Sequence, residues 1–284
     1  MTTAIFFKWL QRHNQFRNPN LILKKPNLEF EIPITEQKNI QNYLQQLSDR
    51  GISFTYPSHP DYPKTFYRMK EPPLFLEYKG HPVWNQKTCL SVVGSRQEDA
   101  LTRLWLESEL VELLNQSPIC LVSGGAKGVD QIVHRCALRA NSPTIVVLPS
   151  GLSELYPNDL KLMEKWILST GGALLSEFEM DQKIHKHHFY FRNRLIANLS
   201  SVTLVAQAQL KSGTLLTVHH ALESGRVVAT IPAHPQQRMF SGNVQLLQDG
   251  AIQILNAQDL DTLLKAETWS SPVRDIENSI SSSD

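Results

Sequence analysis

The sequence feature that most constrains the fold is a glycine-rich turn between a short apolar run and a helical pattern. Residues 119–122 are apolar, residues 123–128 read Ser-Gly-Gly-Ala-Lys-Gly, and from Val129 onward apolar residues recur at helical spacing. Glycine adopts positive φ without strain and lets a ligand approach bare backbone. The helix that follows points its free N–H groups and the positive end of its dipole at the same place. The pattern therefore predicts a strand, a turn and a helix that together form an anion site, with phosphate as the expected anion.

Short apolar runs alternate with helical patterns along most of the chain. Such alternation is typical of a mostly parallel sheet with helices on both faces, so the predicted fold class is α/β. The expected strands are 51–56, 74–78, 88–93, 119–122, 144–148, 173–176, 202–206 and 227–231. The expected helices are about 98–114, 129–140, 158–169, 192–199 and 214–224.

The 284 residues suffice for one large α/β domain and a small appendage. Residues 1–48 are expected to form a short helical N-terminal segment with a break at residues 18–20. Residues 49–256 form the expected main domain. Residues 257–284 are expected to be a helical or disordered tail, polar and disordered from about residue 266.

The composition is that of a soluble globular protein, with 41% hydrophobic and 19% charged residues. No apolar stretch is long enough to span a membrane, and the N-terminus lacks the basic start and long apolar core of a secretory signal. The three cysteines, Cys89, Cys120 and Cys136, lie in apolar runs or on a helix face. We expect them to be buried reduced thiols of a cytoplasmic protein without a membrane partner.

The formal net charge is only +1, so a nucleic-acid partner would need a local basic surface. Residues 181–194 supply one, with Asp181 as their single acid; the basic and imidazole side chains are Lys183, His185, Lys186, His187, His188, Arg192 and Arg194. Three aromatic residues, 189–191, lie among them. Single-stranded nucleic acid requires this mixture, cations for the backbone and rings for unstacked bases. An ordinary aromatic run facing the core is the alternative. No cysteine is near the histidines, so no metal is expected.

Other turns fall at the carboxyl ends of predicted strands, where parallel sheets bind ligands. Gly94-Ser95-Arg96 follows one strand, and we expect Arg96 to bind phosphate rather than to be an ordinary surface arginine. For Lys127, in the glycine-rich turn, a phosphate ligand and an ordinary surface lysine are equally good interpretations. Ser212-Gly213-Thr214 precedes a helix, where the two hydroxyls could cap the helix or donate hydrogen bonds to a phosphate.

Known enzyme signatures are missing from the chain. It contains neither the Gly-x-x-x-x-Gly-Lys-Ser/Thr of P-loop NTPases nor the Gly-x-Gly-x-x-Gly of dinucleotide-binding proteins. No Ser/His/Asp or Cys/His set stands out. Asp130 and His134 lie four residues apart, and we interpret them as a structural pair near a helix start rather than as an acid and a base.

Taken in their order along the chain, the motifs resemble the DNA-processing protein A family (DprA, also called Smf) over about residues 51–255. The weaker motifs are residues 59–63 and 71–76. The stronger motifs are residues 93–96, 123–130 with His134, 151–157, 175–177, 191–197, 212–217, 225–226, 242–243 and 249–251. Two positions depart from the family pattern: Ala233 stands where Pro-Gly is frequent, and Gln207 stands near a position that is commonly acidic.

The resemblance implies an extended Rossmann-like domain that binds single-stranded DNA, forms a homodimer and helps load the recombinase RecA during natural transformation. It implies no catalysis and no cofactor. Carried over by motif, the DNA pocket would include Arg96, Lys186 and Phe189. Arg192, Arg194 and the turn at 123–128 would contact phosphates or shape the pocket, and Lys161 is a weaker candidate.

The sequence thus predicts a non-enzymatic protein that binds and protects single-stranded DNA. A Rossmann-like nucleotide hydrolase or a nucleotide-sensing module is the alternative, although the hydrolase signature Pro-Gly-Gly-x-Gly-Thr-x-x-Glu is missing. The candidate DNA- and phosphate-binding residues are Gly94, Ser95, Arg96, Ser123, Gly124, Gly125, Lys127, Lys186, Phe189, Arg192, Arg194, Ser212, Gly213 and Thr214.

Overall fold

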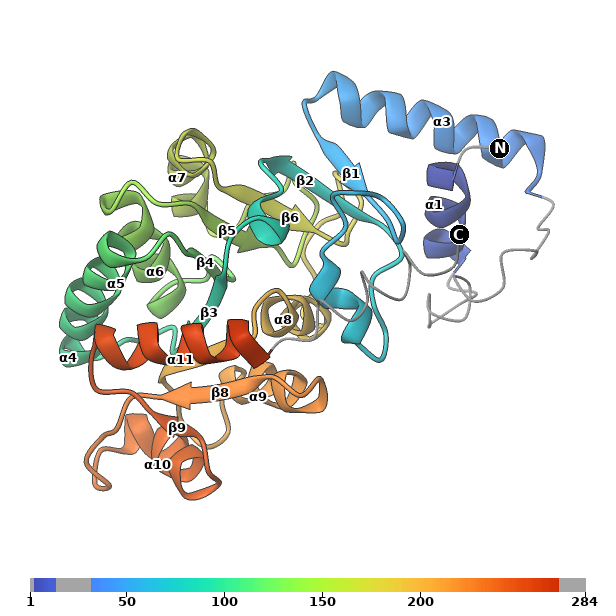
Figure 1. The fold of residues 1–284 in the computed structure, drawn as a ribbon. Coiled ribbons are helices and arrows are strands. Elements are labelled where there is room, and N and C mark those ends of the chain that lie inside the picture. Colours follow the sequence, from blue (N-terminus) through green and yellow to red (C-terminus); the bar gives the residue numbers. More distant parts are fainter. Residues whose placement is uncertain (1–2, 14–31, 271–284) are drawn as a thin grey trace.

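The described part of the chain is built around one mostly parallel sheet (Figure 1). This computed structural model describes residues 3–13 and 32–270. The strand order is β1-β2-β6-β5-β4-β3-β7-β8-β9. Pairing from β6 to β9 is parallel, whereas β1 with β2 and β2 with β6 are antiparallel. The strands are β1 (Ser53–Thr55), β2 (Leu76–Gly80), β3 (Cys89–Gly94), β4 (Cys120–Ser123), β5 (Thr144–Val147), β6 (Ala173–Ser176), β7 (Val202–Gln207), β8 (Val227–Thr230) and β9 (Ile252–Gln253).

Helices cover both faces of this sheet, as the sequence predicts, because successive strand side chains point to opposite sides. In β4, Val122 faces the core beneath α8 and α9, whereas Leu121 faces the core beneath α5 and α6. The helices are α1 (Thr3–His13), α3 (Ile34–Asp49), α4 (Ala100–Trp105), α5 (Val111–Gln116), α6 (Val129–Arg139), α7 (Asn158–Ser169), α8 (His188–Asn198), α9 (Thr214–Glu223), α10 (Ser241–Gln248) and α11 (Ala257–Ser270). Short 3₁₀ helices are η1 (Lys64–Arg68), η2 (Val83–Asn85) and η4 (Arg238–Phe240), and η3 (Leu106–Leu110) is a π-helical turn. None of the described helices combines the length and the apolar composition that crossing a bilayer requires.

The expected helical N-terminal segment contains α1 and α3, which lie beside β1 and β2 at one end of the sheet (Figure 1). Their apolar residues share a core with α7 and β6. Lys8 of α1 is fully buried, and its ammonium lies 3.0 Å from Glu77 of β2. Tyr43 of α3 donates a hydrogen bond of 2.7 Å to the same carboxylate. The predicted break at residues 18–20 lies outside the described residues.

Several predicted boundaries are wrong in their details. The expected helix 98–114 is α4, η3 and α5 in succession, starting after Asp99, whose carboxylate accepts the N–H of Leu101. The expected helix 192–199 begins earlier, at His188, because the His188 ring stacks on Phe178 and bonds the Pro149 carbonyl. α10 and β9 are not among the elements predicted from the sequence.

The predicted disorder from about residue 266 is also wrong for the first part of that segment, since α11 continues to Ser270. Helix α11 packs against the sheet because Leu260 and Leu264 are buried in the same apolar core as residues of α5 and α6. Residues 271–284 lie outside the described part of the chain. The prediction that the three cysteines are buried and form no disulfide is confirmed.

Candidate nucleic-acid interface

A cleft of about 530 Å³ lies at the carboxyl ends of β3 and β7, between the turn after β3 and the helices α8 and α9. We call it the cationic cleft. Nine of the candidate residues line it, and they come from three segments far apart in the sequence: Gly94, Ser95, Arg96, Lys186, Phe189, Arg192, Ser212, Gly213 and Thr214. The fold therefore brings most of the predicted site together.

Arg96 is presented to solvent by two turns that press against each other. The Val129 N–H at the start of α6 donates to the Ser95 carbonyl at 3.1 Å. Gly128 has a φ of 82°, and a Cβ there would collide with the Ser95 carbonyl and the Arg96 backbone. A Cβ at Gly94 would meet the Val129 side chain. Glycine at these two positions permits the close approach that fixes where Arg96 leaves the sheet.

The Phe189 ring contacts two guanidinium groups. Arg96 stands 5.0 Å and Arg192 5.8 Å from its centroid, distances typical of cation–π contacts. Phe189 is half-buried, and Lys186 is exposed in the turn that precedes α8. The structure gives the Lys186 ammonium no ion pair among the described residues. The cleft thus combines two exposed cations with an aromatic ring held in place.

Arg192 forms the floor of the cleft and is 4% exposed. Its Nη1 donates to the carbonyls of Gly124 and Val147, at 2.6 and 2.8 Å. Burial lowers the pKa of Arg192 to about 10, and the nearby Asp130 carboxylate opposes that change. A Cβ at Gly124 would collide with this guanidinium. Gly124 therefore acts through Arg192, by leaving room for the arginine that supports the cleft.

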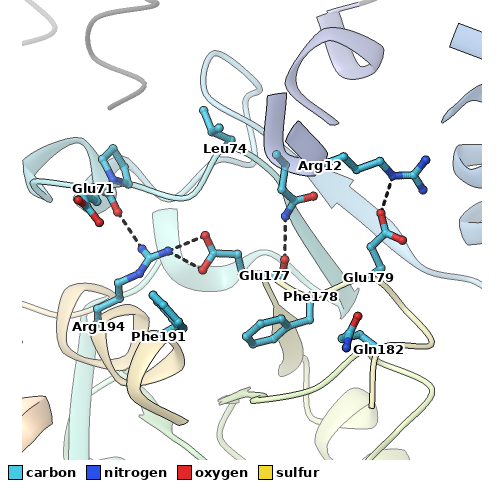
Figure 2. A pocket seen from close by; sticks show the side chains of 11 residues that line it. Arg12, Glu71, Leu74, Glu177, Phe178, Glu179, Gln182, Phe191 and Arg194 are labelled. Atoms are coloured by element: carbon cyan, nitrogen blue, oxygen red, sulfur yellow. Dashed lines mark hydrogen bonds and ion pairs between the residues drawn. The ribbon is translucent and has the colours of Figure 1, made fainter. Parts of the chain in front are cut away.

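Other candidates lie outside the cleft lining. Ser123 is buried and donates to the Val92 carbonyl, and Gly125 packs against Val146 and Leu160. Lys127 and Lys161 are exposed but do not line the cleft. Arg194 binds both carboxylate oxygens of Glu177, each at 2.5 Å, and the Glu71 carbonyl at 2.9 Å (Figure 2).

The loop before α9 does not cap that helix with a side chain. Gly213 is the N-cap residue, so the capping alternative is wrong for Ser212. The Ser212 backbone carbonyl instead accepts the N–H of Leu215 at 3.2 Å. The Ser212 hydroxyl oxygen is buried and has no hydrogen-bond partner among the described residues. Ser212 and Thr214 both line the cleft.

Asp130 and His134 do not pair with each other, which corrects the sequence interpretation. Asp130 accepts the Ala126 N–H at 3.3 Å, whereas His134 Nδ1 lies 2.8 Å from the Thr144 hydroxyl of β5. Burial lowers the pKa of His134 to about 3, so the ring is neutral at physiological pH. Asp130 is therefore bonded to the turn after β4, and His134 to the first residue of β5. In the described part of the chain, no three His, Cys, Asp or Glu side chains gather as they would around a metal ion.

A second hollow, of about 540 Å³, lies on the other side of α8 (Figure 2). We call it the aromatic pocket. Its walls are Gln11, Arg12, Glu71, Pro72, Leu74, Glu177, Phe178, Glu179, Gln182, Phe191 and Arg194. This pocket is not predicted from the sequence, because its walls come from four separate segments. The motifs at 71–76 and 175–177, the aromatic run at 189–191 and Arg194 contribute to it, but no local pattern indicates that they meet.

The chain is similar to proteins of one family over most of its length. Residues 53–265 match the family model described as DNA recombination-mediator protein A. Protein Smf of Synechocystis sp. is 33% identical over 235 residues, which cover 80% of this chain and 58% of that relative. DNA processing protein DprA of Streptococcus pneumoniae is 32% identical over 222 residues, covering 76% of this chain and 78% of that protein.

Solved structures of two proteins with related names are similar to the chain in fold as well as in sequence. The crystal structure of DNA processing protein A from Streptococcus pneumoniae aligns with a TM-score of 0.76 at 27% identity, covering 92% of this chain and 98% of that one. DNA processing protein A from Helicobacter pylori, described for its single-stranded DNA binding mode, aligns with a TM-score of 0.67 at 30% identity and covers 76% and 96%. Sequence and fold agree: the chain belongs to the DNA recombination-mediator protein A family.

Proposed function

We propose that this protein binds single-stranded DNA in the cationic cleft and catalyses no reaction there. The observation that carries the proposal is the grouping of Arg96, Lys186 and Phe189 around one hollow. Two exposed cations beside an aromatic ring are what an unpaired strand requires. The DNA processing protein A from Helicobacter pylori, similar in fold, is described for its binding of single-stranded DNA, which supports the same ligand here.

Each group has a distinct role in this proposal. Arg96 and Lys186 neutralise phosphates, and the Phe189 ring stacks on or wedges beside a base. Stacking contributes about 1–3 kcal/mol per base and tolerates any base, because every base has a π-face. Ser212 and Thr214 add neutral hydrogen bonds. Binding is therefore expected to be largely independent of sequence.

We further propose that the protein acts in the cytoplasm as a homodimer that protects incoming DNA and helps load RecA in transformation and recombination. Relatives from Streptococcus pneumoniae and Bacillus subtilis carry the name DNA processing protein, which supports this role. Light scattering of the purified protein tests the dimer. Co-purification with RecA, with and without oligo-dT, tests the partner.

The alternative of a nucleotide hydrolase has little support in the cleft. Of the described residues that line it, only Asp130 carries a carboxylate, and Arg192 lies beside it. The Asp130 side chain is buried and accepts the Ala126 N–H at 3.3 Å, so it supports the turn after β4. Burial raises its pKa, and the nearby Arg192 opposes that rise. Comparing the affinity for a mononucleotide with that for an oligonucleotide of about 20 nucleotides separates a nucleotide sensor from a strand binder.

Replacing the two exposed cations should weaken DNA binding without affecting folding. We expect Arg96→Ala and Lys186→Ala each to lower the affinity for oligo-dT by about tenfold or more, because a hydrogen bond to a charged group contributes about 1.5–3 kcal/mol. Fluorescence anisotropy measures the affinity, and thermal unfolding checks the fold.

The matched control is Lys38→Ala, which removes an exposed lysine from α3. Its affinity should equal that of the unchanged protein. Parent-like affinity in a folded Arg96→Ala, Lys186→Ala double variant would refute the site.

A further inference from the structure

Helix α8 separates the cationic cleft from the aromatic pocket and contributes an aromatic residue to each. Phe189 lines the cleft, and Phe191 lines the pocket. Two positions along a helix differ in direction by about 200°, so the two rings leave opposite sides of the first turns of α8. Arg192 and Arg194 repeat this division one turn later. The two hollows are therefore neighbours across about one helix diameter, roughly 10 Å.

Two of the three carboxylates in the walls of the aromatic pocket are paired with arginines. Arg194 holds both oxygens of Glu177, and Arg12 bonds Glu179 at 2.6 Å, whereas Glu71 is exposed at the rim and only its backbone carbonyl bonds Arg194 (Figure 2). The Gln11 amide donates to the carbonyls of Phe75 and Glu177, which joins α1 to the opposite wall. Carboxylates paired in this way repel an approaching phosphodiester strand much less than free ones.

Apolar side chains, two of them aromatic, line part of the pocket. Figure 2 shows the Phe178 and Phe191 rings on one side of the hollow and Leu74 on the other. Phe178 is held by stacking on His188, with ring centroids 4.0 Å apart. Phe191 is 43% exposed, although it is a large apolar side chain. A fixed ring beside an exposed ring offers a flat aromatic ligand the stacking that unstacked bases seek.

We call residues 183–187, which run from Gln182 at the aromatic pocket to the start of α8, the ridge. Its Lys183 and Lys186 are exposed, and the structure gives neither ammonium an ion pair among the described residues. His187 lies on the same ridge, edge-on to Phe191 with centroids 6.2 Å apart. An apolar side chain of a partner protein would use the rings and leave these cations without a role. A nucleic-acid strand uses both.

We propose that the aromatic pocket is a second base subsite on the same DNA strand. The cleft holds one part of the strand, the backbone crosses the ridge past Lys183 and Lys186, and an unstacked base enters the pocket against Phe191. This inference rests on the proposed function, because the strand must already occupy the cleft. It predicts that the second subsite contributes only when the oligonucleotide is long enough to reach it.

The test compares short and long oligonucleotides with the intact protein and three variants. Phe191→Ala should leave the affinity for oligo-dT of about 4 nucleotides unchanged and lower the affinity for about 20 nucleotides roughly 5- to 150-fold, the equivalent of one stacked base. Phe191→Leu, which keeps an apolar side chain but removes the ring face, should behave in the same way. Trp166→Ala, which removes an exposed aromatic ring from α7, is the control and should change neither affinity.

A 2-aminopurine placed along the long oligonucleotide reports stacking directly. In the intact protein one position should be quenched by Phe191, and the quenching should disappear in both Phe191 variants. If Phe191→Ala binds the long oligonucleotide like Trp166→Ala and keeps the quenching, the second subsite is refuted while the cleft stands. If Arg96→Ala does not weaken either oligonucleotide, the proposed function itself fails.

Discussion

The four basic side chains at 183–194 lie close to one another in the sequence but have different surroundings in the structure. Lys183 and Lys186 are exposed, Arg192 is buried beneath Phe189, and Arg194 is held by Glu177. All four contribute equally to the basic run that the sequence shows. Their roles differ because burial and existing partners decide whether a cation remains available to a ligand.

Arg192 should matter for stability more than for charge. Arg192→Met would leave the carbonyls of Gly124 and Val147 without their donor and remove the cation beside Asp130. We expect the free energy of unfolding to fall by about 2–4 kcal/mol, since buried groups lose their partners. Urea unfolding monitored by circular dichroism measures it.

The control for this prediction is Lys186→Met, a cation of the same cleft that is exposed. Its free energy of unfolding should stay within about 0.5 kcal/mol of the parent value. Equal stabilities of the two variants would contradict the structural role of Arg192.

At the scale of elements, two arrangements position the hollows. The turns after β3 and β4 interlock through Gly94 and Gly128, which places Arg96 at the cleft. At the other end of the sheet, α1 docks on β2 through the buried Lys8 and supplies Gln11 and Arg12 to the aromatic pocket. The pocket therefore depends on the docking of an N-terminal helix that is far away in sequence.

The effects of replacing Lys8 and Glu77 on the free energy of unfolding should be strongly non-additive. Burial raises the pKa of Glu77, and the Lys8 ammonium opposes that rise. Lys8→Met leaves a buried carboxylate without its cation, and we expect a loss of about 3–5 kcal/mol in the free energy of unfolding. Adding Glu77→Gln to Lys8→Met should recover part of the loss, as urea unfolding of the full double-mutant cycle would measure.

Lys38→Met on the neighbouring α3, an exposed position, serves as the control and should be nearly neutral. Strictly additive effects of Lys8→Met and Glu77→Gln would show that the two side chains do not interact energetically.

At the scale of the whole molecule, charge is balanced and its distribution matters. The net charge of +1 excludes a protein that attracts DNA over its entire surface. Four exposed cations, Arg96, Lys127, Lys183 and Lys186, nevertheless lie near the carboxyl ends of the strands, and none of them has an ion pair among the described residues. Association with DNA is therefore expected to depend on a few local contacts.

These few contacts predict a moderate salt dependence. With three or four phosphates neutralised, the logarithm of the binding constant should fall against the logarithm of salt concentration with a slope of about −2 to −3. Arg96→Ala should make the slope shallower by about 0.7, whereas Lys38→Ala should not change it. Oligo-dT titrations across a salt series provide the measurement. A slope near zero would contradict phosphate binding.

Much of the strand and helix order could be predicted, because it follows from local periodicity. β6 and α7 begin and end where the pattern places them. Errors arose where distant contacts decide: His188 starts α8 early through Phe178 and Pro149, and α11 persists because Leu260 and Leu264 are buried. α10 is held by Asn243, whose side-chain amide forms hydrogen bonds at the ends of β7 and β8. These contacts are distant in sequence, so apolar periodicity does not predict the helix.

Sequence patterns alone predict the α/β class, the glycine-rich turn after β4 and the presence of cations and rings at 183–194. Apolar spacing, glycine and charge are properties of neighbouring residues, so they can be interpreted without a structure. The folded arrangement is needed to know which of these cations face solvent and that α8 divides two hollows. The reason is physical: exposure and ion pairing depend on partners such as Gly124 for Arg192 and Glu71 for Arg194, which folding brings together across long stretches of chain.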